Sequence, residues 1–298
     1  MKVGFHLPQW GDTATRRGVL DVARCVEDTG LDSVWASDHI VYPLRLETKY
    51  PYGEGTPFRP EEGYLEGLAM LAVIAGATAR VELGTSVLVV PQREPLLLAK
   101  TAVTIDVLSS GRLILVVGAG WWREEFAALG APFHTRGLRT DETIQALRLL
   151  WREGIASFEG RTIRFDEIAC LPRPVRAGGV PILVGGLTEP ALRRAVRLGD
   201  GWHGLGSRVE PLREARRRLE ELCLAEGRDP RTLRFSTSAG LPRDPAVAVE
   251  RLGPLAGLGV DQLVLSTPAE SATELCARIE AFAAHVLPAL RTLAAAAS

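Results

Sequence analysis

The feature that most constrains the fold is an eightfold alternation of short apolar runs with helical patterns. Each run is rich in Val, Ile or Leu and is followed by residues with helical periodicity. The runs are 3–7, 33–36, 82–91, 113–117, 180–184, 200–205, 233–238 and 261–266. Since strands that alternate with helices in one chain pair in parallel, this pattern predicts an α/β fold, a single (β/α)8 TIM barrel over residues 1–298. A doubly wound sheet is the alternative, although neither Gly118-Ala119-Gly120 nor Gly185-Gly186 completes the dinucleotide-binding fingerprint.

Two segments interrupt the alternation. Residues 40–63 lack periodicity and are rich in Tyr, Pro and Gly. A loop of this length inside a compact chain is usually functional, and we expect it to form a lid. Residues 155–175, after the fourth helical region, contain a β-type stretch at 157–163 and predict a small insertion.

Composition argues against several classes of protein. The formal net charge of −1 lacks the basic surplus of a nucleic-acid binder. No apolar run approaches the roughly 20 residues that span a bilayer, and the strand-like first residues do not predict a signal peptide. The four cysteines are too far apart for a zinc or redox motif. We therefore expect a cytoplasmic protein that acts on a small molecule, without a nucleic-acid or membrane partner.

The run at 82–91 has an unusual centre. Gly84, Thr85 and Ser86 put small and hydroxylated residues where a buried parallel strand would carry Val or Ile. Glycine inside a strand marks either a tolerated kink or the close approach of a ligand or of another backbone segment. The stretch alone leaves both interpretations open.

In a barrel of this kind, the residues at the strand ends surround the site. They include His6, Asp38, His39, Ser86, Gly118, Gly120, Trp121, Trp122, Gly185, Gly186, Leu187, Thr188 and His203. Asp38 and His39 are adjacent and point to different places, so no metal site is expected. No catalytic triad or nucleophile elbow is evident either.

Local context separates some of these candidates. Gly185-Gly186-Leu187-Thr188 before a helix predicts backbone amides that bind a phosphate, or else an ordinary capped turn. We expect His39 to face the site and one of Trp121 and Trp122 to border a pocket. The charged residues 123–125 are expected to be solvated or structural.

Several of these motifs together resemble the bacterial luciferase-like superfamily. The matching stretches are Ser37-Asp38-His39-Ile40, Leu83-Gly84-Thr85-Ser86-Val87-Leu88, residues 108–113, Gly118-Ala119-Gly120-Trp121, Arg123-Glu124-Glu125-Phe126, Gly185-Gly186 and residues 198–202. They are most similar to the branch that uses the deazaflavin coenzyme F420. The similarity extends over nearly the whole chain, whereas the substrate is not specified by it.

The resemblance implies roles for individual residues. It implies a cis peptide at Ser86–Val87 behind the cofactor ring, and Asp38 and His39 as the catalytic pair. The implied cofactor-binding residues are His6, Thr85, Ser86, Val87, Gly118, Gly120, Trp121, Gly185, Gly186, Leu187 and Thr188. Tyr50, Trp122 and His203 are implied as lid or substrate residues.

One departure from the family pattern bears on the reaction. The F420-dependent sugar-phosphate dehydrogenases carry a glutamate in the loop after the fourth strand, where this chain has Trp121-Trp122-Arg123. Sugar-phosphate oxidation is therefore not expected. His39 is the leading candidate for the proton donor, followed by His6 and Tyr50.

The function implied by the resemblance is F420-dependent hydride transfer to an activated C=C, C=N or C=O bond of a small organic compound. Arg45 and Lys49 of the lid are candidates for the anionic tail of F420. The alternatives are an FMN-dependent monooxygenase and a non-catalytic flavin- or deazaflavin-binding protein. Residues 64–78 read as a helix that is apolar almost all round, which predicts a homodimer.

Overall fold

The computed structural model describes residues 1–51 and 59–296 and shows a closed barrel of parallel strands. The order around the barrel is β3 (Glu82–Thr85), β2 (Ser33–Ala36), β1 (Lys2–His6), β11 (Gln262–Ser266), β10 (Arg234–Gly240), β9 (Gly201–Leu205), β8 (Ile182–Gly185) and β5 (Leu113–Gly118). Pairing of Leu83 with Leu113 closes the ring. The predicted (β/α)8 barrel is confirmed.

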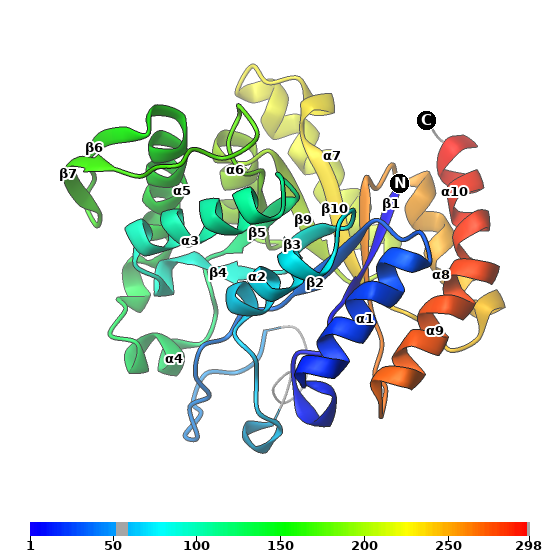
Figure 1. Ribbon diagram of the computed structural model, residues 1–298. Helices are drawn as coiled ribbons and strands as arrows, with labels where there is room; N and C mark the ends of the chain where they lie inside the picture. Colours follow the sequence, from blue (N-terminus) through cyan, green and yellow to red (C-terminus); the bar gives the residue numbers. More distant parts are fainter. Residues whose placement is uncertain (52–58, 297–298) are drawn as a thin grey trace.

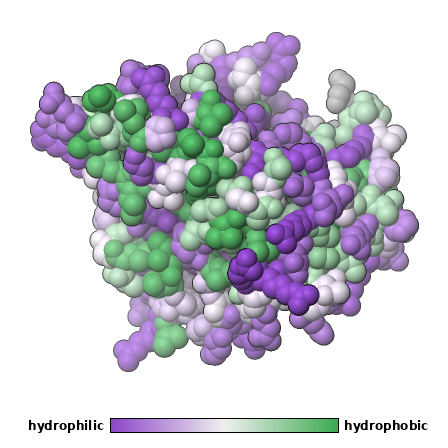
Figure 2. All heavy atoms as spheres, viewed as in Figure 1, coloured by the Kyte–Doolittle hydropathy of each residue, from purple (hydrophilic) through white to green (hydrophobic). Residues whose placement is uncertain are grey.

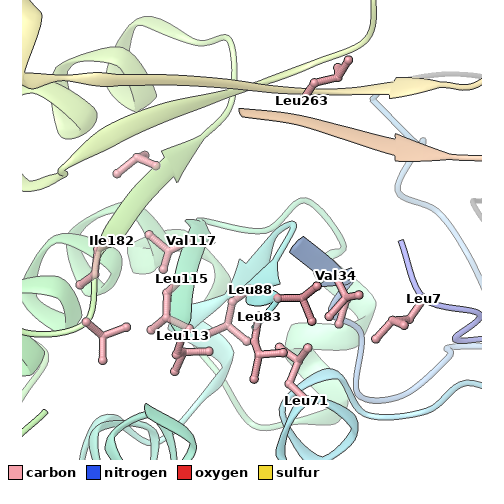
Figure 3. Packing of buried hydrophobic residues seen from close by; sticks show 14 of the residues in the cluster. Leu7, Val34, Leu71, Leu83, Leu88, Leu113, Leu115, Val117, Ile182 and Leu263 are labelled. Carbon is pink, nitrogen blue, oxygen red and sulfur yellow. The ribbon is translucent and has the colours of Figure 1, made fainter. Parts of the chain in front are cut away.

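Helices surround the barrel on all sides (Figure 1). They are α1 (Arg16–Asp28), α2 (Gly67–Ala77), α3 (Pro95–Leu108), α4 (Arg123–Ala128), α5 (Arg136–Glu153), α6 (Glu189–Leu198), α7 (Val209–Ala225), α8 (Pro245–Gly257), α9 (Ala272–His285) and α10 (Leu287–Ala296). Buried aliphatic side chains such as Leu83, Leu113 and Ile182 pack between strands and helices (Figure 3). Burying such a side chain stabilises the fold by about 1.5–3 kcal/mol.

The run at 82–91 is divided into two strands. β3 ends at Thr85, β4 (Leu88–Val89) resumes the pairing with β5, and the Ser86–Val87 peptide between them is cis. The Thr85 hydroxyl lies 3.0 Å from both the backbone nitrogen and the carbonyl oxygen of Val116, which joins β3 to β5 just before the break.

The segment 155–175 contains an antiparallel hairpin of β6 (Ile155–Glu159) and β7 (Arg164–Ala169), which projects beside α5 (Figure 1). Glu142 of α5 accepts hydrogen bonds from the backbone nitrogens of Arg161 at 2.6 Å and Thr162 at 2.8 Å. The carboxylate therefore holds the hairpin turn against the barrel wall.

The helix expected at 64–78 begins later than predicted. Glu66 caps α2 through the Ala69 amide at 2.6 Å, so Tyr64 lies outside the helix and stacks on Trp10 instead. Among the described helices, none taken singly has the length and apolar character of a membrane span. The bent pair α9 and α10 meets that test only when the two are combined, and α9 buries Leu275, Ile279 and Phe282.

Candidate active site at the barrel mouth

The Ser86–Val87 step is the partly exposed point of an otherwise buried strand. Thr85 and Leu88 on either side are 1% and 0% exposed, whereas Ser86 and Val87 are both partly accessible. The Val87 side chain packs on an inner cluster that includes Trp35 and Val264. The Ser86–Val87 peptide is therefore supported by the packing of Val87 inside the barrel, while both residues stay partly accessible to solvent.

Two glycines make room for Val87. A Cβ added at Gly185 would lie 2.6 Å from Val87 Cγ1, and one added at Gly118 would lie 3.0 Å from Val87 Cγ2. Real Cβ atoms do not approach as closely as the first distance, so a side chain at Gly185 would displace Val87. The glycines at the ends of β5 and β8 thus serve the packing of the break.

His203 supports the same step from inside the barrel. Its Nε2 lies 3.0 Å from Ser86 Oγ and its Nδ1 lies 2.8 Å from Ser236 Oγ. His203 is 0% exposed and packs against Trp35. Burial lowers the pKa of His203 to about 3, and repulsion from His6 acts in the same direction. The ring is therefore neutral at physiological pH and supports Ser86 from a buried position, and the substrate role expected for it stays a prediction.

His6 ends β1 close to this buried cluster. Burial lowers the pKa of His6 to about 4, so it too is neutral near pH 7. Its side chain keeps partial access to solvent. A neutral imidazole at the mouth can donate one hydrogen bond and accept another.

His39 is held by a buried carboxylate that we had expected to be solvated or structural. Its Nδ1 lies 2.9 Å from Glu125 Oε2, and Glu125 Oε1 accepts a hydrogen bond from the Ile40 nitrogen at 2.7 Å. Glu125 is 1% exposed. Burial acts to raise the pKa of Glu125, but the hydrogen bonds from His39 and Ile40 and the charge of His39 outweigh it and lower this pKa. The carboxylate is therefore ionised and orients the His39 ring.

Aromatic rings enclose His39 on several sides. Trp122, Trp121 and Tyr64 lie edge-on to it, with ring centroids 5.3, 6.1 and 6.2 Å away. Trp121 and Trp122 stack on each other at 5.0 Å. Trp121 is partly exposed, whereas Trp122 is 1% exposed, so Trp121 is the tryptophan that borders the mouth and Trp122 is a wall residue.

Asp38 has structural contacts. Its carboxylate accepts hydrogen bonds from Arg93 at 2.6 Å and from the backbone nitrogen of Val89 at 2.8 Å, and its side chain is 1% exposed. Arg93 also pairs with Glu66 at 2.6 Å. These contacts fasten β4 to the residue that precedes His39. The contacts of Asp38 are those of a positioning residue, and the catalytic role expected for it stays a prediction.

The described part of the lid is anchored at several points. Glu124 Oε1 accepts hydrogen bonds from the backbone nitrogens of Glu47 and Thr48 at 2.7 and 2.8 Å. Burial acts to raise the pKa of Glu124, but hydrogen bonds from Thr48 and Glu47 lower it to about 2. Gln9 joins the segments on either side of the lid, because its Nε2 donates to Ser37 O at 2.8 Å and to Leu65 O at 2.7 Å. Tyr50 contacts Trp121 with centroids 5.2 Å apart.

The glycine turn after β8 differs from the expected phosphate cradle in two respects. The Gly186 nitrogen already donates to His203 O at 3.3 Å, and the Thr188 side chain makes no capping hydrogen bond. Leu187 and Thr188 are exposed. After the neighbouring strand β5, Arg136 Nε donates to Gly120 O at 3.3 Å and brings a positive charge to this rim.

The predicted residues fall into two groups. Mouth or rim positions are taken by His39, His6, Ser86, Val87, Gly120, Trp121, Gly185, Gly186, Leu187, Thr188 and Tyr50. Thr85, Gly118, Trp122, His203 and Asp38 are buried and act through packing or hydrogen bonds. Arg45 and Lys49 are exposed, and the lid residues Tyr52 and Phe58 lie outside the described residues. Within the described ranges no group of three His, Cys, Asp or Glu is arranged to hold a metal ion.

The fold and this mouth define a class of protein, a (β/α)8 barrel with a broken third strand behind its site. The profile of the luciferase-like monooxygenase family matches residues 1–288, so the chain belongs to that family, as the sequence motifs predicted, and is an enzyme.

Individual relatives agree with this assignment. An uncharacterized protein of Mycobacterium tuberculosis (strain H37Rv) is 30% identical over 272 residues, or 89% of this chain and 92% of the relative. The F420-dependent glucose-6-phosphate dehydrogenase of Kineococcus radiotolerans is 33% identical over 241 residues, or 77% and 66%.

Solved structures share the fold at lower identity. The monooxygenase RslO1 of Streptomyces bottropensis superposes with a TM-score of 0.77 at 21% identity, covering 97% of this chain and 99% of that one. An F420-dependent secondary alcohol dehydrogenase in complex with an F420–acetone adduct gives a TM-score of 0.74 at 18% identity, with the same coverage.

Proposed function

We propose that this enzyme is an F420-dependent oxidoreductase that transfers a hydride between the deazaflavin and a C=C, C=N or C=O bond of a small organic compound. The observation that carries the proposal is the orientation of His39 by ionised Glu125 beside the mouth. A histidine held in this way can exchange a proton with a substrate atom while the cofactor exchanges the hydride. Relatives with F420-dependent activities support the choice of cofactor.

The mouth fits a planar cofactor with a phosphate. The partly exposed Ser86–Val87 step, supported by His203 and Val87 packing, would lie against the ring. The turn at Leu187–Thr188 and the loop at Gly120, with Arg136, would face the phosphate through backbone amides and positive charge. When bound, the deazaflavin supplies a hydride donor or acceptor.

In this proposal the residues of the chain exchange the proton, exclude water and position His39. Glu125 accepts a hydrogen bond from the Nδ1–H group of His39. This leaves Nε2 as the atom that, when protonated, gives a proton to the substrate during reduction and, when unprotonated, takes one during oxidation. Trp121, Trp122 and Tyr64 limit the access of water to His39. Asp38 keeps His39 in register with β4 through Val89.

An FMN-dependent monooxygenase is the second candidate. It is favoured by the family match and by the likeness of the fold to RslO1. Both cofactors carry a phosphate next to a planar ring system, so the same rim would serve either.

The deciding experiment is a fluorescence titration of the purified protein with F420 and with FMN at two salt concentrations. We expect F420 to bind at least about tenfold more tightly, a difference of about 1.4 kcal/mol. Preference for FMN would assign the enzyme to the second candidate. His39→Ala then tests the role of His39: turnover falls while F420 affinity is retained, and unchanged turnover removes His39 from the proposal.

We also propose a homodimer and a cytoplasmic setting. The outer faces of α2 and α3 expose Val73, Leu97 and Leu108 by 56, 66 and 62%, and hydrophobic side chains gather over these helices in Figure 2. A surface of this kind is favourable to bury against a second copy. The four cysteines are free thiols, as is usual in a reducing compartment.

A further inference from the structure

A cavity of about 160 Å³ lies on the lid side of His39. Its lining consists of His39, Ile40, Val41, Tyr42, Arg59, Pro60, Gly63 and Tyr64. This lining is largely apolar or aromatic. No residue of the glycine-lined rim assigned above to the cofactor belongs to this lining, whereas His39, the residue that the proposed function uses for proton transfer, does.

The volume of this half-open pocket suits a small molecule. A cavity of about 150 Å³ lined by apolar side chains accommodates benzene, whereas pockets for drug-sized ligands measure about 300–1,000 Å³. The space beside His39 thus matches one small ring or a short chain.

The charges of the lining are already compensated. Arg59 pairs with Glu62 through Nε at 3.3 Å, and its side chain is 79% exposed, so its charge is directed to solvent. His39 is bonded to Glu125. An anionic substrate group in this cavity would lose hydration without gaining an uncompensated cation.

The apolar wall is fixed relative to His39. Glu125 Oε1 accepts hydrogen bonds from the backbone nitrogens of Ile40 at 2.7 Å and Val41 at 3.4 Å, while Oε2 bonds His39. One carboxylate therefore sets both the proton-exchanging ring and the two aliphatic residues next to it. Ile40 and Val41 remain 38% and 41% exposed, which leaves apolar area for a ligand to cover.

From these observations we infer that the substrate is a small uncharged compound, one ring or a short chain in size, with its apolar part against Ile40 and Val41. This inference rests on the proposed function for the reaction itself. The reactive C=O or C=C group would be directed toward His39. In reduction, bound reduced deazaflavin would supply the hydride, two electrons and one hydrogen, to one carbon of that group. His39, protonated at Nε2, would give the proton that converts the π electron pair into the O–H or C–H bond of the partner atom, and would be left neutral.

The inference can be tested by binding alone, so its failure is distinct from failure of the cofactor assignment. Ligand-detected NMR would measure the affinities of cyclohexanone, cyclohexanecarboxylate and glucose 6-phosphate for the full-length protein. We expect cyclohexanone to bind at least about tenfold more tightly than either anion. Tighter binding of an anion, or no binding of cyclohexanone, overturns the inference.

Two variants locate the binding. Val41→Phe fills part of the cavity and should weaken cyclohexanone binding at least tenfold, whereas Val175→Phe, at a valine that is 55% exposed and outside the cavity lining, should leave it unchanged. Thermal melting confirms that both variants fold. If Val41→Phe has no effect, or if Arg59→Gln selectively abolishes anion binding, the cavity does not select uncharged ligands and the inference is wrong.

Discussion

The Nδ1 atom of His39 lies 2.9 Å from Oε2 of Glu125, a carboxylate that is 1% exposed and comes 86 positions later in the chain. Glu125 bonds the Ile40 nitrogen with its other oxygen. Imidazole orientation and the start of the lid are thus fixed by a single residue of α4. The relationship makes Glu125 a positioning residue for the proposed proton transfer.

Replacing Glu125 should therefore affect the tautomer of His39. We expect Glu125→Gln to lower kcat at least about tenfold, less than the about 10²–10⁴-fold range for loss of a general acid in His39→Ala. Nitrogen NMR of the imidazole should show a decrease in the Nδ1-protonated form. Glu124→Gln is the matched control, because Glu124 bonds lid amides and makes no hydrogen bond to His39; an equal change in that variant would contradict the role of Glu125.

The ion pair of Asp38 predicts a large effect on stability. Removing one partner of a buried pair leaves the other charge uncompensated and costs about 3–5 kcal/mol. We expect Asp38→Asn to lower the free energy of unfolding by an amount near this range, because Arg93 is 15% exposed. Glu66 pairs with the same arginine but is 35% exposed, so Glu66→Gln should cost about 1 kcal/mol or less. Urea denaturation at pH 7 compares the two; equal losses would show that burial of Asp38 is energetically unimportant.

The neutral His203 predicts a loss of stability in mild acid. Its pKa is about 3 in the folded protein against an ordinary value of 6.5. Between these values the unfolded chain binds a proton that the folded protein does not. The stability that neutral His203 contributes to the folded protein is therefore fully present above about pH 6.5. It declines as the pH falls toward 3, at up to about 1.4 kcal/mol of unfolding free energy per pH unit.

Urea denaturation of the wild type and of His203→Gln from pH 7 to pH 4.5 measures this effect. We expect the variant to be less stable at pH 7 and to lose less stability on acidification. His6, with a folded pKa of about 4, adds a slope of the same sign in both proteins and cancels in the comparison. Parallel pH profiles would mean that His203 does not carry the acid sensitivity.

The comparison of sequence with structure shows what a pattern can and cannot predict. Strand and helix periodicity predicted all eight barrel strands, since it reflects burial of each segment on the sheet. The same reasoning placed His39 at the mouth but missed Glu125. An acidic residue in the first turn of a short helix is ordinary, and its partner 86 positions away is set by how β2 and β5 lie in the barrel.

Other differences arise from contacts between distant segments. Trp122 and Asp38 follow strands and His203 lies within β9. Each turns into the protein: His203 toward Ser86 and Ser236, Trp122 toward His39 and Tyr42, Asp38 toward Arg93. A strand end places a residue at the rim, whereas the direction of its side chain depends on partners that the sequence does not identify.

The apolar faces of α2 and α3 predict the oligomeric state. Leu97 and Leu108 of α3 are 66% and 62% exposed. We expect a homodimer by multi-angle light scattering at micromolar concentration, and dissociation in the Leu97→Asp/Leu108→Asp variant. Leu224→Asp, at the similarly exposed Leu224 of α7, should leave the dimer intact. A monomeric wild type would exclude this interface.

β5 ends at Gly118 and β8 ends at Gly185, and the packing of Val87 between them suggests a direct test of why glycine is needed at these two positions. Gly185→Ala would bring its Cβ to 2.6 Å from Val87 Cγ1, so Val87 and the Ser86–Val87 step must move. We expect a loss of about 1–3 kcal/mol in the free energy of unfolding, the usual cost of overpacking a core, and weaker cofactor binding. Gly240→Ala, whose Cβ meets no atom within 4 Å, is the control for the change from Gly to Ala itself.

A second substitution separates crowding from loss of a phosphate contact. Val87→Ala removes the methyl groups that Gly185→Ala would strike, so the double variant should regain stability and affinity relative to Gly185→Ala. If Gly185 serves the phosphate directly, the double variant will bind F420 no better than Gly185→Ala does. Calorimetric affinities of the two single variants and the double variant form a double-mutant cycle, and a favourable coupling between the sites would establish that Gly185 acts through Val87.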